Sequence, residues 1–489
     1  MRVLVPESRH RLGAQGLHGL LSEDPGVDPV SAGVDATNVV VIVVDCLRSD
    51  YAEPLKAELA KLGFTAYSRV VAPAPWTVPS HASMLTGLYP TAHGAHETRS
   101  RKSLDVRLQP GPDLLSLELR ERGYTTWLLS ANSFLQPKFG FVGFDHAYVP
   151  RLNPHVRILS PGELREIVEI RRDHGARSRL QLAKALLAEG RPGLLIKALV
   201  NRVVKNACLY LAAVTRHWPR SKGAVLLIKE LDRLLRRRPR EPLFILMNFM
   251  ELHEPYFLRD PFIRVQKVLW RRDARPHPAL LREWRERYRE RAEYLAAKVL
   301  EVLGILKRWE LLNRSLVIVT SDHGQLLGEH GKVGHGVFLY EELLRVPLLI
   351  KYPYPVERID EKGYVSLTKL KRVILDVVDN KLSEDAPLYD EVVFAETHGI
   401  HARITDVLSE EERRKLEELE RHRVAIYYAG LKGIFNVVEQ KFEEVVPHER
   451  GAYVSDDAIS HMRREVRRFL AEAARVRVRR ALKRAKLRA

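Results

Sequence analysis

The chain has little cysteine and no long apolar run. Only Cys46 and Cys208 occur among 489 residues, so no disulfide framework is available and a reducing compartment, the cytoplasm, is expected. No stretch reaches the roughly 18 consecutive apolar residues that a membrane-spanning helix needs. The first residues, Met1 to Glu7, lack a long apolar region before any small-residue cleavage site, so no signal peptide is predicted.

What is present indicates a folded protein. Hydrophobic residues make up 45% and charged residues 29% of the chain, which is typical of globular domains and not of disordered ones. A chain of 489 residues can bury a large core, and we expect one large α/β domain with appendages.

The net charge of +18 is unevenly distributed. Residues 151–240 contain 21 Lys or Arg against 7 Asp or Glu, a balance of +14. Residues 460–489 contain 12 basic against 2 acidic residues, a balance of +10. The remainder of the chain is therefore mildly acidic, and the basic character belongs to an internal segment and to the tail.

Three polar clusters adjoin predicted regular elements. Asp45 ends the strand-like run 39–44, and Asp322 with His323 ends the run 316–319. Thr77 comes before the helix-like run 82–85. Open α/β sheets keep their chemistry where strands end, so these residues predict a divalent-metal site with a hydroxyl nucleophile. Taken alone, Asp322 could equally be a helix cap.

The same segments, in this order, resemble the sulfatase branch of the alkaline-phosphatase superfamily. Residues 45–50 match its Asp-x-Leu-Arg-x-Asp pattern, and residues 79–87 match its Pro-Ser-x-Ala-x-x-Leu-Thr-Gly block. Residues 321–324 and 328–331 match its Ser-Asp-His-Gly and Gly-Glu-His-Gly pair. Several ordered blocks are more specific than any single motif.

The resemblance implies a mostly parallel α/β sheet flanked by helices, and a divalent ion (Mn, Zn, Mg or Ca) bound by Asp45, Thr77, Asp322 and His323. Usual sulfatases carry Cys or Ser at the nucleophile position and Arg four residues on, the signal for conversion to formylglycine. Here Thr77 and His81 stand at those positions, so no formylglycine is expected. Threonine is similar to the nucleophile of the phosphodiesterase and phosphoglycerol-transferase branches. Cys46 could add a soft thiolate that favours zinc, or be a small buried residue.

Further candidate residues follow from the resemblance. His253 follows the strand-like run 243–249 and is similar to a family histidine that faces the substrate, where it could protonate the leaving oxygen. His335 and Lys332 stand near the position where sulfatases carry an anion-binding lysine. His398 is noted only because it follows a strand-like run.

The predicted organisation has four parts. Residues 1–37 form a leader, and residues 38–350 form the catalytic domain, with a basic helical insertion at 151–240. Residues 351–455 form a C-terminal α+β subdomain, in which residues 424–438 predict a hairpin. Residues 456–489 form a basic helical tail.

Both basic segments show helical periodicity. In the tail, apolar residues recur at helical spacing: Met462, Val466, Phe469, Leu470 and Ala473. In the insertion, short apolar stretches between residues 194 and 211 are interrupted by basic residues. Such helices fit peripheral binding to an anionic membrane at its inner face, or a packed lid with a solvated basic face. Nucleic acid is disfavoured because the tail lacks a recognised module and interleaved aromatics.

These features predict a metal-dependent hydrolase that cleaves an anionic ester, a phosphodiester, phosphomonoester or sulfate ester, through Thr77. One alternative is a phosphoglycerol-type transferase that acts on a lipid or glycan. Another is a catalytically lapsed relative that binds an anionic membrane or polymer. The oligomeric state is left open by the sequence.

Overall fold

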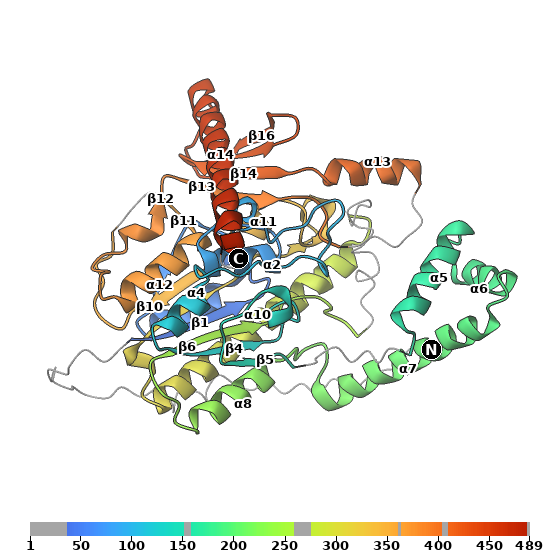
Figure 1. Ribbon diagram of the computed structural model, residues 1–489, viewed down its shortest axis with the longest axis horizontal. Coiled ribbons are helices and arrows are strands. Elements are labelled where there is room, and N and C mark those ends of the chain that lie inside the picture. The colour runs from blue at the N-terminus through green and yellow to red at the C-terminus, as the bar shows by residue number, and fades with distance from the viewer. Residues whose placement is uncertain (1–36, 151–157, 259–274, 360–362, 403–408, 487–489) are drawn as a thin grey trace.

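The computed structural model describes residues 37–150, 158–258, 275–359, 363–402 and 409–486 (Figure 1). The predicted leader lies outside these residues, apart from Thr37. A seven-stranded sheet forms the centre, in the order β2-β10-β7-β1-β6-β4-β5. Its strands are β1 (Asn38–Val44), β2 (Thr65–Tyr67), β4 (Thr125–Ser130), β5 (His146–Tyr148), β6 (Leu243–Phe249), β7 (Ser315–Thr320) and β10 (Leu348–Lys351).

The sheet is mostly parallel. β1 pairs in parallel with β6 and β7, and β4 pairs in parallel with β6 and β5. Only β10 runs against its neighbours, β7 and β2. Because β1 and β6 lie inside the sheet and are covered on both faces, they are buried along their whole length and, apart from Asn38 and Asn248, apolar rather than alternating.

Two hydrophobic cores lie on the two faces of this sheet, and alternate residues of β1 point into each. Val40, Ile42 and Val44 belong to one core, with the buried sides of α1 (Glu53–Ala60), α8 (Ala224–Leu235) and α10 (Pro278–Arg308). The odd-numbered valines of β1 belong to the other, with α2 (Thr77–Thr86), α4 (Leu115–Glu121) and α12 (Leu370–Val378). The expected α/β fold, a mostly parallel sheet flanked by helices, is confirmed.

A separate antiparallel sheet follows, made of β13 (Val392–Thr397), β14 (Arg423–Tyr428), β15 (Leu431–Asn436) and β16 (Lys441–Pro447). β14 and β15 form the hairpin predicted at 424–438. Buried apolar residues between 365 and 388 belong to the core of the main sheet, and the division at 351–455 stays a prediction. The smaller elements are β3 (Val70–Val71), α3 (Pro90–His93), β8 (Leu326–Leu327), β9 (Val333–Gly334), α11 (Glu341–Leu344), β11 (Tyr364–Ser366), β12 (Tyr389–Asp390) and α13 (Glu410–Leu419).

The tail is one long helix, α14 (Asp456–Lys486), whose apolar side is covered. Met462, Val466 and Phe469 are buried against the antiparallel sheet, and the Phe469 ring stacks on Phe394 with a centroid separation of 4.2 Å. The tail helix therefore packs as a structural element through the residues that the sequence placed on one face.

The basic insertion divides into two parts. α5 (Pro161–Asp173), α6 (Arg179–Ala188) and α7 (Pro192–Arg216) stand apart from the body in Figure 1 and share a small core of their own. The next helix, α8, belongs to the main core, since Leu227, Ile228 and Leu231 are buried against the central sheet. Within the described residues, no helix is long and apolar enough to cross a membrane.

Candidate active site

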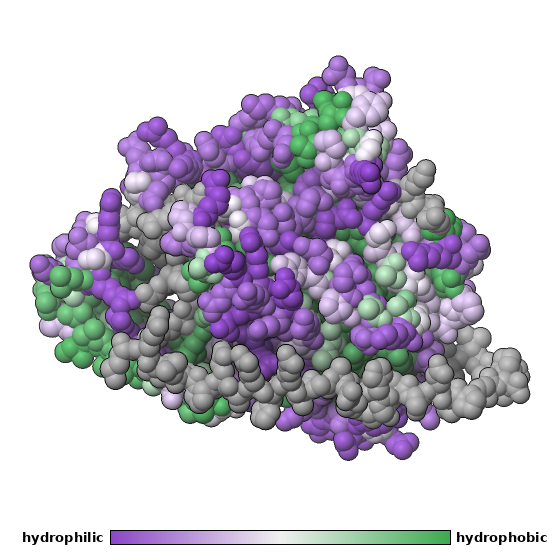
Figure 2. All heavy atoms as spheres, turned by 180° about the vertical axis from the view of Figure 1, so that it is seen from behind, coloured by the Kyte–Doolittle hydropathy of each residue, from purple (hydrophilic) through white to green (hydrophobic). Residues whose placement is uncertain are grey.

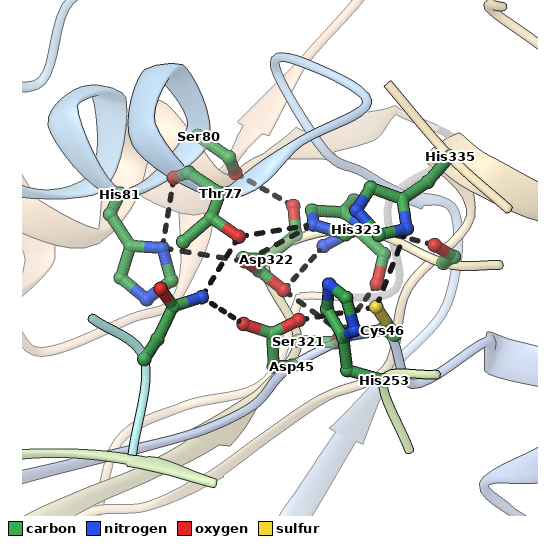
Figure 3. A network of polar contacts seen from close by, with 12 residues as sticks. Asp45, Cys46, Thr77, Ser80, His81, His253, Ser321, Asp322, His323 and His335 are labelled. Carbon is green, nitrogen blue, oxygen red and sulfur yellow. Dashed lines mark hydrogen bonds and ion pairs between the residues drawn. The ribbon is translucent and has the colours of Figure 1, made fainter. Parts of the chain in front are cut away.

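Four neighbouring strands deliver polar side chains to one edge of the central sheet. Asp45 follows β1, Asn132 follows β4, His253 follows β6, and Asp322 with His323 follows β7. These strands are adjacent and parallel, so their carboxyl ends meet at this edge. Figure 3 shows the side chains that follow β1, β6 and β7 gathered around one point.

Thr77 reaches the same point from the opposite side, as the first residue of α2. Its hydroxyl oxygen lies 3.5 Å from Nε2 of His323 and accepts a hydrogen bond of 3.2 Å from Asn132 Nδ2. One turn on, the Ser80 hydroxyl donates to the carbonyl oxygen of Asp322 at 2.7 Å, which ties the helix to the loop after β7. A hydroxyl at a helix N-terminus sits where the helix dipole stabilises a negative charge.

Asp45 and Asp322 are both fully buried. Asp45 accepts hydrogen bonds from Asn132 Nδ2 at 2.8 Å and from Cys46 Sγ at 3.1 Å. Burial alone would raise the pKa of Asp45, but nearby His323 and His253 and the Asn132 hydrogen bond lower it. Burial, and then the charge of Asp45, raise the pKa of Asp322 well above its ordinary value. Two adjacent buried carboxyl groups can both be ionised only if a positive charge compensates them.

The residues fit a divalent cation. The Oδ2 atom of Asp322 is buried and has no hydrogen-bond partner among the residues that the structure describes. One ligand atom from each of Asp45, Asp322 and His323 can be chosen so that all lie within 4.8 Å of one another. His323 Nδ1 lies 2.9 Å from the carbonyl of Gly324, so it carries the proton and the Nε2 lone pair faces the carboxylates. This is the arrangement of a metal-ligating histidine.

Cys46 lies beside these ligands as a buried thiol. Burial, and then the charges of Asp45 and Asp322, raise the pKa of the Cys46 thiol well above its ordinary value. The sulfur donates to Asp45 rather than accepting a proton, as a neutral thiol does. One ligand atom from each of Cys46, His323 and His335 also lies within 4.8 Å of the others, so both interpretations open from the sequence remain.

His335 contacts the cluster from the loop after β9. Its ring centroid lies 4.5 Å from that of His323 and 4.9 Å from that of His253. Burial, and then His323, lower the pKa of His335 well below its ordinary value. Its Nδ1 donates to Gln325 Oε1 at 2.7 Å, so the neutral ring presents a lone pair at Nε2. His335 would have to gain a proton before it could hold an anionic oxygen there.

The other two candidates from the sequence lie closer to solvent. The His253 side chain is 23% exposed, the most exposed of the cluster, and its Nδ1 lies 2.8 Å from the carbonyl oxygen of Glu254. It therefore stands where substrate could enter, with Nε2 available. The ammonium of Lys332 lies 6.0 Å from the centre of the Phe338 ring, whereas His335 from the same loop reaches the cluster directly.

Sequence reasoning missed Asn132, which bridges Asp45 and Thr77. The signal was its position directly after a strand in the second βα unit, but an asparagine after a strand is also a common turn residue. It also missed Gln325, whose amide nitrogen donates to Glu254 at 2.7 Å and whose oxygen fixes His335. His81, at the expected arginine position, is buried and holds the carbonyl oxygen of Thr77 at 3.1 Å.

The sequence matches the family described as "Sulfatase" over residues 37–380, which is most of the chain. The chain belongs to the sulfatase family. Members of this family generally use a divalent metal, which agrees with the ligand groups gathered at the sheet edge.

Solved structures show the same fold. A phosphonate monoester hydrolase from Silicibacter pomeroyi superposes with a TM-score of 0.59 at 16% identity, covering 90% of this chain and 95% of that one. A 2-O GAG sulfatase gives a TM-score of 0.55 at 15% identity, covering 90% and 92%. The chain thus shares the alkaline-phosphatase-like architecture of sulfatases and phosphonate monoester hydrolases.

Curated relatives match over short stretches. The low-salt glycan biosynthesis sulfotransferase Agl7 of Haloferax volcanii is 39% identical over 71 residues, which cover 14% of this chain and 18% of the relative. Human arylsulfatase H is 28% identical over 148 residues, covering 28% of this chain and 23% of the relative. The chain therefore spans less than a quarter of either relative. Family and fold together support an ester-cleaving enzyme.

Proposed function

We propose that this sulfatase-family protein is a metal-dependent enzyme that cleaves an anionic ester with the Thr77 hydroxyl as nucleophile. One observation carries the proposal: Oγ1 of Thr77 lies 3.5 Å from His323 Nε2, beside the two buried carboxyl groups, at the N-terminus of a helix. This places a hydroxyl next to a cation site and in the electrostatic field that stabilises an alkoxide.

The residues of the site have different proposed roles. Asp45, Asp322 and His323 would hold the cation, which when bound would lower the pKa of the hydroxyl and offset the charge of the ester oxygens. Asn132 donates to Thr77 Oγ1, which orients its lone pairs and stabilises negative charge as the proton leaves. Thr77 is the first residue of α2, so the positive end of the helix dipole adds to this stabilisation.

His253 is the proposed general acid. Its Nδ1 is held by the Glu254 carbonyl, so protonation at Nε2 would produce an imidazolium that can give its proton to the leaving oxygen. Partial exposure leaves that nitrogen open to substrate. His335 and Lys332 stay candidates for holding a charged substrate oxygen, and His335 could do so only in its protonated form.

The molecule that attacks the covalent adduct on Thr77 distinguishes two related activities. Attack by water on the Thr77 adduct gives a hydrolase, while attack by an alcohol gives a transferase acting on a lipid or glycan. The transferase is supported by the partial match to Agl7, which is named as a glycan biosynthesis sulfotransferase. A lapsed enzyme is the less supported alternative, because Asp45, Thr77, Asp322 and His323 are all present and close together.

A substrate panel tests the proposal. Metal-loaded protein would be assayed against a sulfate monoester, a phosphate monoester, a phosphodiester and a phosphonate monoester, with and without an added alcohol acceptor. Turnover of one class that disappears in Thr77→Ala supports the enzyme. Absence of turnover on all four, with a correctly folded and metal-loaded protein, contradicts it.

We further propose that α7 binds an anionic membrane surface. One side of this helix carries an exposed apolar stripe at helical spacing: Ile196, Leu199, Val200, Val203, Tyr210, Leu211 and Val214. Figure 2 shows apolar residues gathered at the edge of the molecule where α5–α7 lie. Arg202 and Lys205 are exposed on the other side of the same helix, while Lys197 pairs with Glu163 of α5 at 2.6 Å.

The basic residues of α7 indicate which kind of partner binds the apolar stripe. A basic helix with an unburied apolar face matches the headgroup region of an anionic bilayer, where the apolar side enters and the basic side contacts phosphates. The opposite side of α7 is covered in its first half by α5 and α6, in the core that contains Leu186 and Leu194. The exposed stripe is thus left for a partner. The cytoplasmic location predicted from the sequence stays a prediction.

A further inference from the structure

A second cluster of metal-ligating side chains lies on the antiparallel sheet, on different elements from the site of Thr77. Glu396 belongs to β13, and the register of β13 with β14 pairs Glu396 with Val424 and Thr397 with Arg423. His398 and His422 are the next pair outward. Their rings stack with a centroid separation of 3.9 Å, and Glu396, two residues before His398, shares their side of the sheet.

The two histidines converge on one carboxylate oxygen. Oε2 of Glu396 lies 3.3 Å from Nε2 of His398 and 3.0 Å from Nε2 of His422. One ligand atom from each of these residues lies within 4.8 Å of both others. In a tetrahedral zinc site with bonds of about 2.0–2.1 Å, ligand atoms are separated by about 3.3 Å. The separation of 3.3 Å from His398 Nε2 equals such an edge, and the separation of 3.0 Å from His422 Nε2 is slightly shorter.

Contacts with Thr91 orient the carboxylate of Glu396. The other oxygen of Glu396, Oε1, accepts a hydrogen bond of 3.1 Å from the backbone N–H of Thr91 in α3. The Thr91 hydroxyl donates to Oε2 and lies 3.4 Å from His398 Nε2. Glu396 is fully buried, whereas the side chains of His398 and His422 are 11% and 19% exposed, so the histidine side gives access for an ion. A ligand held in place by backbone contacts is typical of a built metal site.

His96 lies beside this cluster. Its ring stacks on that of His398 with a centroid separation of 3.6 Å, and only 4% of the residue is exposed. Its Nδ1 lies 2.8 Å from the carbonyl oxygen of Glu97, so the proton belongs on Nδ1 and a lone pair on Nε2. That buried Nε2 finds no hydrogen-bond partner within the described part of the chain. His96 is not among the residues whose ligand atoms converge, so its ring packs against His398 beside the cluster and is not counted as a ligand.

We propose that Glu396, His398 and His422 bind a zinc ion, with the fourth position taken by a water molecule. Two imidazoles and one carboxylate are ligands that zinc prefers among the common divalent ions, whereas magnesium and calcium prefer oxygen alone. An ion pair is the alternative explanation of the cluster. Two charged imidazoles stacked at 3.9 Å would repel each other, so an ion pair leaves one of the two neutral and its contact weaker.

The ion would connect the antiparallel sheet to the nucleophile. Glu97 follows His96, and its carboxylate accepts hydrogen bonds from the backbone N–H of His398 at 2.8 Å and from Trp76 Nε1 at 2.7 Å. Trp76 directly precedes Thr77. A zinc ion bound to His398 and His422 would thus hold the sheet against the segment that positions the N-terminus of α2.

Zinc stoichiometry tests this site without reference to activity. The full chain, free of any histidine tag, would be stripped with a chelator, dialysed against buffered Zn²⁺ and analysed by elemental analysis. We expect His398→Gln and His422→Gln each to bind about one ion fewer than wild type. Asp322→Asn should lose a different ion, so the combination with His398→Gln should lose both. If the proposed metal site beside Thr77 is wrong, Asp322→Asn will bind as much zinc as wild type. The zinc lost in His398→Gln and His422→Gln will not be affected.

A matched control is His174→Gln, which removes a histidine from an exposed pair with Glu189 at 2.7 Å in the insertion. It should bind as much zinc as wild type. If His398→Gln and His422→Gln fold and retain full zinc, the site is refuted. If either variant misfolds, Co²⁺ added to Asp322→Asn gives the answer: absorption bands of tetrahedral cobalt that vanish with the isosteric change Glu396→Gln support the site, and the absence of such bands refutes it.

Discussion

The hydroxyl oxygen of Thr77 lies 3.5 Å from Nε2 of His323, although the two residues are 246 positions apart in the chain. One comes from the start of α2 and the other from the end of β7, and the Ser80 hydrogen bond to Asp322 joins the two segments. The contact places a hydroxyl beside a nitrogen lone pair and two buried carboxyl groups. Substitutions at Thr77 and at the proposed metal ligands test the role of this contact.

Replacing Thr77 by alanine should abolish turnover and leave the fold intact. The hydroxyl is the proposed nucleophile, and loss of a nucleophile lowers kcat by roughly three orders of magnitude or more. The melting temperature should change little, because the substitution removes only one hydroxyl and one methyl group from the first residue of α2. Thr77→Ser is the matched control and should keep measurable activity. Mass spectrometry should detect a covalent adduct on residue 77 in the wild type, and activity retained in Thr77→Ala would rule this role out.

Removing a carboxylate from the cation site should remove the ion. Asp45→Asn and Asp322→Asn should each lower the divalent metal content of the active site and the activity, because an amide oxygen is a neutral and weaker ligand. Asp50→Asn is the control: Asp50 belongs to the same sequence motif, but its side chain is 59% exposed and pairs with Arg48. Equal metal content in all three variants would contradict the ligand assignment.

Buried neutral histidines should make the protein less stable in acid. Burial lowers the pKa of His93 to about 3, while the same histidine in the unfolded chain titrates near 6.5. The unfolded state therefore binds the proton first, and stability is lost as the pH falls from about 6.5 towards 3. Between pH 6.5 and 5 this one group accounts for about 2 kcal/mol.

Denaturant unfolding of wild type and His93→Gln across this pH range measures the effect. The variant should be less stable at neutral pH, since His93 bonds Ser83 and the backbone of Pro79 and Ala95. Its dependence on pH should nevertheless be shallower than that of wild type. Parallel pH profiles for the two proteins would show that His93 does not contribute.

The sequence predicted the fold and most of the site because these depend on local signals. Asp45 and Asp322 follow apolar runs, and strand ends meet at one edge of a parallel sheet. Asn132 was missed since one asparagine after a strand carries no specific signal. The pairing of His398 with His422 depends on the register of β13 and β14, which is set by long-range packing. The position of α8 in the core was also missed, because its basic residues resemble those of the neighbouring insertion.

The apolar side of α14 should contribute to stability. The Phe469 ring stacks on Phe394 and meets Tyr89 edge-on at 5.1 Å, so Phe469→Ala should cost about 3–5 kcal/mol. Val478 lies on the same helix but is 58% exposed, and Val478→Ala should be within about 0.5 kcal/mol of wild type. Chemical denaturation compares the two. Deletion of residues 460–489 should likewise lower the melting temperature, whereas an unchanged value would mean that the tail does not pack on the sheet.

The exposed stripe of α7 should carry the contact with an anionic membrane. Leu199→Glu and Val203→Glu together place two negative charges in the centre of the stripe, where they oppose both burial in the headgroup region and attraction to anionic lipid. We expect wild type to cosediment with phosphatidylglycerol vesicles at low salt and to dissociate at high salt, because each basic residue near such a surface contributes about 1 kcal/mol. The double variant should not bind.

Leu104→Glu is the matched control, since Leu104 is 66% exposed but lies outside the insertion, and it should bind vesicles as wild type does. Activity on a small soluble ester should be the same in all three proteins, because α7 carries none of the residues proposed for chemistry. Vesicle binding that is absent in wild type at low salt contradicts the membrane assignment. If wild type instead forms a dimer that the double variant does not form, the stripe is the contact between two copies of the chain, and the basic residues beside it serve another purpose.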